Sequence, residues 1–170
     1  GKNNIGIFNN DSTLTHNGII EVKHNGAGTE NIGVHNTGNF KFFVTKDPLN
    51  PNKIGKIDVE GQNGTIGISA VTDSTSTGWV SFTNATVNVN APDKNAGKIP
   101  LGVYASGNKI TVSSTGTTKF TVSPNAIGLY MNGNNTSKMT GTFDFSLSSE
   151  NTKSSMGIGA FLTGGAYALS

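Results

Sequence analysis

The sequence predicts an all-β chain, folded as a parallel β-helix (a solenoid) of about five to six turns with three short strands per turn. Three observations predict this fold. A four-residue phrase with Gly between two apolar residues recurs six times. Two short segments of alternating apolar and polar residues usually follow each copy, and turn-forming Asn and Gly residues separate the segments. Such recurrence is typical of repeat architectures.

The repeated phrase sets the length of one turn. Its six copies are Ile5–Phe8, Ile32–His35, Ile66–Ser69, Leu101–Tyr104, Ile127–Tyr130 and Met156–Gly159. The steps between their glycines are 27, 34, 35, 26 and 29 residues. Stacked turns would lie ~4.8 Å apart, so we expect the first and third residues of each copy to form buried ladders. Each fully buried aliphatic side chain would contribute roughly 1.5–3 kcal/mol.

The alternating segments supply the second and third strands of each turn. They are Thr13–Thr15 with Ile20–Val22, Phe40–Phe42 with Ile57–Val59, Val80–Phe82 with Val87–Val89, Ile110–Val112 with Phe120–Val122, and Met139 with Phe143–Phe145. Their period of two predicts half-buried strands. The Pro-containing stretches 46–56 and 91–100 are expected to be loops. An antiparallel sandwich would also have many short strands, but it gives no reason for the glycine phrase to return.

Composition excludes several classes of function. The chain has 170 residues and a net charge of +2, and its twelve basic residues are all Lys. Without Arg or a basic field, we expect no nucleic-acid partner. The absence of Cys excludes disulfides, thiolate metal sites and Cys nucleophiles. No stretch approaches the ~18 apolar residues of a membrane helix, and nothing indicates a cofactor.

A candidate binding surface follows from the predicted side-chain directions. If the first and third residues of the phrase point inward, the glycines form a bare outward track. The fourth residues then also point outward, and they are Phe8, His35, Ser69, Tyr104, Tyr130 and Gly159. We expect Phe8, His35, Tyr104 and Tyr130 to border a platform for a sugar ring or a partner's backbone. Stacked outward aromatic residues can equally stabilise a sheet without binding anything.

Catalytic residues are not predicted. Polysaccharide lyases and hydrolases on β-helices need convergent carboxylates. The outward acids of the third strands are Glu21, Asp58 and Glu60, with Asp144 isolated further along. A paired site there remains an alternative to an ordinary solvated strand face.

The histidines and the single tryptophan carry no recognisable motif. His16, His24 and His35 lack the spacing of a metal site, so no metal is expected. Trp79 directly precedes the predicted strand Val80–Phe82, and the sequence assigns it no role.

Two phrases carry a resemblance to a known family. Asn4–Asn10 and Ala126–Gly133 resemble the repeated Gly-Ile-Gly-[Ile/Leu/Val]-[Tyr/Phe]-x-Asn phrases in passenger domains of large type V autotransporters, such as the fusobacterial surface adhesins. The resemblance implies a right-handed β-helix displayed outside the cell and a role in adhesion. The implied partners are proteins or glycans on host or other bacterial cells.

The same resemblance implies a place in a larger protein. Residues 1–170 would be one β-helix segment of a longer passenger, with adjoining repeats of the same chain on both sides. Such a passenger is anchored in the bacterial outer membrane by a C-terminal barrel that is absent from this sequence, or it is secreted. It implies no catalytic residues. Besides the carbohydrate-active enzyme, a second alternative is the stem of a pore-forming autotransporter toxin, because Gly157–Ala168 is rich in Gly, Ala and apolar residues.

Overall fold

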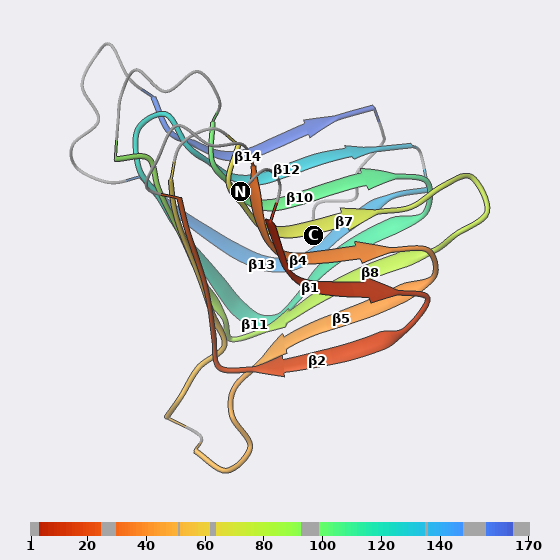
Figure 1. Ribbon diagram of the computed structural model, residues 1–170, viewed down its shortest axis with the longest axis horizontal. Helices are drawn as coiled ribbons and strands as arrows, with labels where there is room; N and C mark the ends of the chain where they lie inside the picture. The colour runs from red at the N-terminus through yellow and green to blue at the C-terminus, as the bar shows by residue number, and fades with distance from the viewer. Residues whose placement is uncertain are drawn as a thin grey trace.

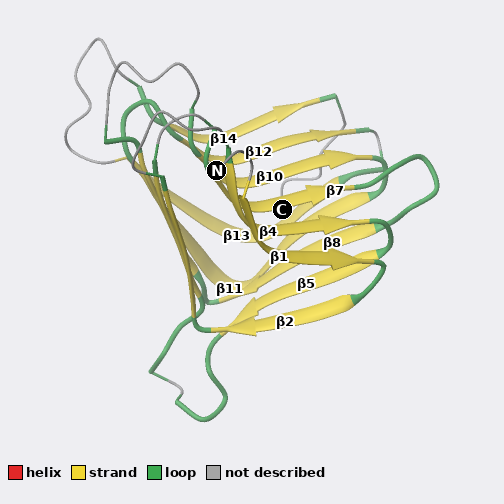
Figure 2. Ribbon diagram, viewed as in Figure 1, coloured by secondary structure: helices red, strands yellow, loops and turns green. Residues whose placement is uncertain are grey.

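The computed structural model of the chain describes residues 4–24, 30–50, 52–61, 64–92, 99–134, 136–147 and 156–164. All regular structure in these ranges is β-strand, which confirms the predicted all-β class (Figure 2). Among these residues, no helix has the length and hydrophobicity needed to cross a membrane. The strands are β1 (Asn4–Asn10), β2 (Thr13–Asn17), β3 (Ile19–Lys23), β4 (Asn31–Thr37), β5 (Phe40–Thr45), β6 (Lys56–Glu60), β7 (Ile66–Val71), β8 (Gly78–Thr83), β9 (Thr86–Asn90), β10 (Leu101–Gly107), β11 (Ile110–Val122), β12 (Ile127–Gly133), β13 (Lys138–Leu147) and β14 (Ile158–Thr163).

The glycine phrases build one sheet. It has six parallel strands in the order β1-β4-β7-β10-β12-β14 (Figure 1). The first residues of the phrases are paired in register from one strand to the next, in the order Ile5, Ile32, Ile66, Leu101, Ile127 and Ile158. The predicted return of the chain to the same place is therefore confirmed for the first five copies.

The register of the sixth copy differs from the prediction. The sequence predicts Met156–Gly159, but the structure aligns Ile158 with Ile127 and Phe161 with Tyr130. Two apolar-glycine-apolar phrases overlap here, and the later one stacks the Phe161 ring on Tyr130 with centroids 5.3 Å apart. Met156 precedes the strand and is 77% exposed. Of the Gly- and Ala-rich stretch, Ile158–Thr163 forms β14 and residues 165–168 lie outside the described part.

The second and third segments of each turn belong to one larger sheet. Its order is β2-β5-β8-β11-β9-β6-β3, and β13 also pairs with β11. The strand β11 joins two predicted segments, because its first half pairs with β8 and its second half pairs with β9. Figure 1 shows β11 and β13 curving from one side of the molecule to the other. The structure therefore has two parallel sheets where the sequence predicts three separate strands per turn; this arrangement is consistent with a β-helix.

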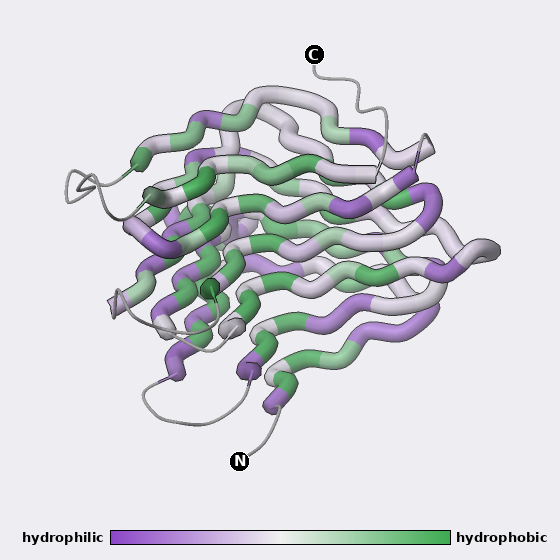
Figure 3. Tube along the Cα trace, turned by 90° about the horizontal axis from the view of Figure 1, so that it is seen from above, coloured by the Kyte–Doolittle hydropathy of each residue, from purple (hydrophilic) through white to green (hydrophobic). Residues whose placement is uncertain are grey.

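Apolar side chains from all three segments meet between the sheets. Fully buried members of the ladders include Val34, Ile68, Val103 and Leu129 from the six-stranded sheet, and Phe42, Val80, Val112, Ile57, Val87 and Phe120 from the larger one. Figure 3 shows apolar segments of successive strands at corresponding positions. At roughly 1.5–3 kcal/mol for each buried Val, Leu, Ile or Phe, these ladders are the main stabilising feature of the fold.

A polar ladder replaces the apolar one at one end of the six-stranded sheet. The side chain of Asn36 is fully buried, and its Oδ1 accepts a 2.9 Å hydrogen bond from Asn9 Nδ2. Asn36 Nδ2 in turn donates to the Ser69 carbonyl oxygen at 3.3 Å. The same position in the following strands is apolar, with Ala70 and Ala105 fully buried. Hydrogen bonds between successive strands thus satisfy amides that would otherwise be costly to bury.

The glycine of the phrase points inward, so the predicted outward glycine track is wrong. A Cβ atom built on Gly102 would lie 2.6 Å from the Gly128 carbonyl oxygen and 2.8 Å from methyl carbons of Val87 and Val89. The third residue, Val103, also points inward, whereas the first residue, Leu101, is half-exposed. The period of two is therefore interrupted at each glycine. Gly is present because both the carbonyl oxygen of the neighbouring strand and the side chains of the opposite sheet lie too close for a side chain.

The predicted loops lie where the chain leaves the sheets. The stretch 46–56 is a long loop that connects β5 to the start of β6 at Lys56, and Pro51 lies outside the described residues (Figure 1). Of the stretch 91–100, residues 93–98 lie outside the described part, and the remaining residues are not in strands.

Candidate functional site

The fourth residues of the phrases form a continuous row on the outer face of the six-stranded sheet. This aromatic row consists of Phe8, His35, Ser69, Tyr104, Tyr130 and Phe161, which are paired in register on successive strands. The structure thus brings all four predicted binding residues into one row, and Phe161 takes the place predicted for Gly159. Phe8 and Phe161, at the two ends, are 61% and 44% exposed, while Ser69 is buried.

Ring contacts divide the aromatic row into two parts. Tyr130 stacks on Tyr104 with centroids 5.5 Å apart and on Phe161 with centroids 5.3 Å apart. Phe8 lies against His35 at 5.6 Å in a tilted arrangement. A 3.0 Å hydrogen bond joins His35 Nδ1 to Ser69 Oγ, and burial lowers the pKa of His35. The imidazole is therefore neutral near pH 7, so this surface carries no cationic charge from the row.

An apolar groove runs beside Tyr104 and Tyr130, and sequence reasoning missed it. Its volume is about 570 Å³, and its lining includes Ile32, Ile66, Leu101 and Ile127, the first residues of four phrases, together with Ile99 and Glu30. These aliphatic residues were expected to be inside. They face the groove because the alternation is interrupted at the glycine. The surface is consequently a groove with aliphatic and tyrosine walls, rather than a bare glycine platform.

The acidic residues of the third strands also lie together, but two of them, Glu21 and Asp58, each form an ion pair with a lysine. Glu21 pairs in register with Asp58, and Lys23 pairs with Glu60. Lys23 Nζ lies 2.7 Å from Glu21 Oε1, and Lys56 Nζ lies 2.8 Å from Asp58 Oδ2. Asp58 Oδ1 also accepts a 2.7 Å hydrogen bond from Asn88 Nδ2. The arrangement forms a charged surface network.

Asp144 lies in a different row from these acids, because its in-register partner on β11 is Lys119. Among the described residues, no group of three His, Asp or Glu side chains is placed to hold a metal ion. His16 lies within β2, and burial lowers its pKa. His24 follows β3, where its Nδ1 lies 3.1 Å from Asn31 Nδ2.

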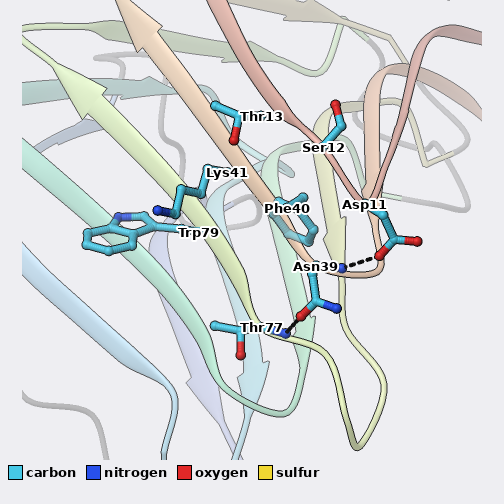
Figure 4. A pocket seen from close by; sticks show the side chains of 8 residues that line it. All are labelled: Asp11, Ser12, Thr13, Asn39, Phe40, Lys41, Thr77 and Trp79. Carbon is cyan, nitrogen blue, oxygen red and sulfur yellow. Dashed lines mark hydrogen bonds between the residues drawn. The ribbon is translucent and has the colours of Figure 1, made fainter.

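A second cleft surrounds Trp79 on the eight-stranded sheet, where the sequence assigned no role. Its lining, shown in Figure 4, consists of Asp11, Ser12, Thr13, Asn39, Phe40, Lys41, Thr77 and Trp79. These residues come from three successive turns of the chain. The available sequence signals were the polar turn residues around Asp11 and Asn39 and the presence of a single tryptophan. The register between β5 and β8, which places Trp79 beside Lys41, could not be predicted from the sequence.

Hydrogen bonds fix the cleft's polar side chains. Asp11 Oδ1 accepts a 2.8 Å bond from the Asn39 backbone N–H, and Asn39 Oδ1 accepts a 2.9 Å bond from the Thr77 backbone N–H (Figure 4). The indole Nε1 of Trp79 donates to Ser113 Oγ at 2.7 Å. Each turn thus orients a side chain of the preceding turn.

Comparison with known proteins gives no match to this chain among protein-family models, curated proteins or solved structures.

Proposed function

We propose that the chain is a segment of a right-handed parallel β-helix, carried in the passenger of a bacterial surface autotransporter, and that it supports adhesion. Among the strands that the structure describes, all pairings are parallel, with one register shift between β11 and β13, and this supports the architecture. The right hand follows from the rule that connections between parallel strands of one sheet are almost always right-handed. An experimental structure with left-handed connections would contradict it.

The observation that carries the adhesive role is the aromatic row with its apolar groove. Tyr104 and Tyr130 are stacked, half-exposed and next to Leu101 and Ile127 in the groove wall. Tyrosine side chains of this kind present a rigid apolar face and a hydroxyl group, which is why they are enriched in protein interfaces. We therefore infer that a cell-surface protein or glycan is bound on this face.

The resemblance of the Asn4–Asn10 and Ala126–Gly133 phrases to autotransporter passengers supports the location. Adjoining turns of the same polypeptide are the proposed neighbours of the edge strands. In β1, Ile5, Ile7 and Phe8 are exposed, whereas their partners in β4 are more covered. Protease shaving of intact bacteria that carry the full-length protein, followed by detection of released peptides from this segment, tests the location. Failure to release them from intact cells would contradict it.

Cell binding tests the adhesive role. The double variant Tyr104→Ala/Tyr130→Ala removes both rings, and Tyr104→Phe/Tyr130→Phe is the matched control because it keeps the stack. With fluorescently labelled protein and flow cytometry on epithelial and bacterial cells, we expect the alanine variant to lose binding by ~10-fold or more. The phenylalanine variant should retain most of it. Equal binding by the alanine variant and the unaltered protein would refute an adhesive role for this face.

The enzymatic alternative retains one supporting observation, the proximity of Glu21, Asp58 and Glu60 on one face. It predicts release of reducing ends or unsaturated sugars from a polysaccharide, and loss of that activity in Asp58→Asn. Glu21 and Asp58 are each engaged by a lysine, so neither carboxylate stands free to meet a substrate, which favours the adhesive proposal.

A further inference from the structure

The Trp79 cleft has the features of a sugar-binding site. We propose that it binds one pyranose unit of a glycan, with the ring stacked on Trp79 and its hydroxyl groups bound by Asp11, Asn39 and Lys41. The cleft lies on the eight-stranded sheet, while the aromatic row lies on the six-stranded sheet. The inference is therefore independent of the proposed adhesive face.

The indole ring provides a fixed apolar surface. Trp79 is 42% exposed, and its N–H is bound to Ser113 Oγ, so one edge of the ring is held while part of the side chain remains open. Its in-register neighbours are Lys41 on β5 and Thr111 on β11. A ring held in this way loses little conformational freedom when a ligand stacks on it. The aliphatic C–H face of a pyranose is a suitable partner for the electron-rich face of an indole.

The polar side chains leave hydrogen-bonding capacity for hydroxyl groups. Asp11 and Asn39 each use Oδ1 in the turn contacts described above. Within the described residues, Asp11 Oδ2 and Asn39 Nδ2 form no hydrogen bond, and Lys41 forms no ion pair. The lining thus combines an aromatic ring on one side of the cleft with an anionic acceptor and an amide donor on the other, and the ammonium group of Lys41 is in the strand next to Trp79 (Figure 4). Alternating donors and acceptors are what vicinal hydroxyl groups require.

The size and charge of the cleft select among ligand classes. Its volume is about 370 Å³, near the lower end of the ~300–1,000 Å³ range of small-molecule sites. The floor includes the buried Phe40 ring, so the cleft is shallow on that side. A phosphate-bearing ligand would place its charge near the Asp11 carboxylate, which opposes binding. A neutral sugar meets both Asp11 and Lys41 without that repulsion, so neutral pyranosides are the favoured ligands.

The single tryptophan makes the experiment specific to this site. Because the chain contains one Trp, both its fluorescence emission and the indole N–H signal in a ¹⁵N NMR spectrum report on Trp79 alone. The probes are the methyl pyranosides of glucose, galactose, mannose, N-acetylglucosamine and N-acetylneuraminic acid, titrated to ~10 mM, which detects millimolar affinities. We expect at least one probe to shift both signals saturably. If none of the five does, the proposal is overturned.

Variants separate this cleft from a distant effect on the indole. Asp11→Asn keeps the Oδ1 acceptor and suits the positive φ of 49° at this position, while removing the carboxylate. Lys41→Gln removes the ammonium group. We expect either change to lower the affinity for the probe sugar by ~10-fold, which corresponds to the loss of a hydrogen bond to a charged group. The matched control is Lys138→Gln, an exposed lysine in register with Thr111 and two strands from Trp79, which should bind normally.

Trp79→Phe tests the stacking directly, with binding followed by saturation-transfer NMR on the probe sugar. We expect weaker but measurable binding, since a smaller ring remains. Each variant is compared only if its far-UV circular dichroism and melting temperature match those of the unaltered chain. Normal binding by both Asp11→Asn and Lys41→Gln would place the sugar elsewhere and refute the proposal. Loss of cell binding in the tyrosine variants would leave these titrations unchanged, so the two proposals fail separately.

Discussion

Replacing Gly102 by Ala tests the inward direction of the glycines. The added Cβ would lie 2.6 Å from the Gly128 carbonyl oxygen and 2.8 Å from each of two methyl carbons, on Val87 and Val89. Both valines are almost fully buried, so neither can move into solvent. Overpacking of this kind costs about 1–3 kcal/mol, and the lower entropy of the unfolded chain returns about 0.4–1 kcal/mol. We expect a net loss of about 1–2 kcal/mol in the free energy of unfolding.

Urea denaturation followed by circular dichroism measures this loss, and the melting temperature should fall by about 2–8 °C for a chain of this size. Gly6→Ala is the matched control at the edge of the same sheet. Its Cβ would lie 2.8 Å from the Gly33 carbonyl oxygen, but its three nearest atoms all belong to the Gly33 backbone and none to a side chain of the opposite sheet, so a smaller loss is expected. If Gly102→Ala is as stable as the unaltered chain, the glycine does not face the opposite sheet and the reasoning is wrong.

Three other predictions concern stability. Asn36→Ala removes the 2.9 Å acceptor of the buried Asn9 amide, which keeps its longer 3.4 Å bond to the Ser12 carbonyl oxygen. It should cost about 1–3 kcal/mol by urea denaturation, and an unchanged midpoint would contradict the polar ladder. Val103→Ala should lower the free energy of unfolding by about 2–3 kcal/mol, because Val103 is buried. Leu101→Ala, at the half-exposed first position, should lower it by about 1 kcal/mol or less. A larger loss for Leu101→Ala than for Val103→Ala would indicate that the first residue is buried, as the sequence predicted. Burial lowers the pKa of His16 and His35 below 6.5, so these histidines are protonated in the unfolded chain at a higher pH than in the folded chain. Stability should be full above pH 6.5 and fall as the pH decreases below it; a double His→Gln variant should flatten this decline in melting temperature.

Strand pairing could be predicted because it depends on a repeated pattern. Each return of the glycine phrase brings equivalent residues together, as in the pairs Ile32 with Ile66 and Leu101 with Ile127. The failure at the sixth copy has a physical cause. Two overlapping phrases have the same pattern, and contacts with the preceding turn and the core, such as that between Phe161 and Tyr130, accompany the later one. That contact is between turns, so the local sequence does not contain it.

Side-chain direction was harder to predict than pairing. A period of two assigns the first and third residues of the phrase to the same face, and the prediction for Leu101 and Val103 followed from it. The assumption fails where Gly102 allows the backbone to approach Val87 and Val89. Five members of the aromatic row were nevertheless predicted in the same row, with Phe161 in place of Gly159, because alternation resumes after the glycine. The apolar groove was missed for the same reason that the glycine track was wrongly predicted.

The two outer faces use different means to present a surface, and both depend on stacking of turns. On the six-stranded sheet, the inward glycine turns an aliphatic residue outward on four strands, and their combined surface forms the apolar groove. Around Trp79, each turn instead orients a polar side chain of its neighbour, from Asp11 to Asn39 to Thr77. A single turn contains neither surface. Because each surface needs three or more turns in register, changes that shift the register, such as insertion of one residue in β4, should remove both without altering any residue that lines them.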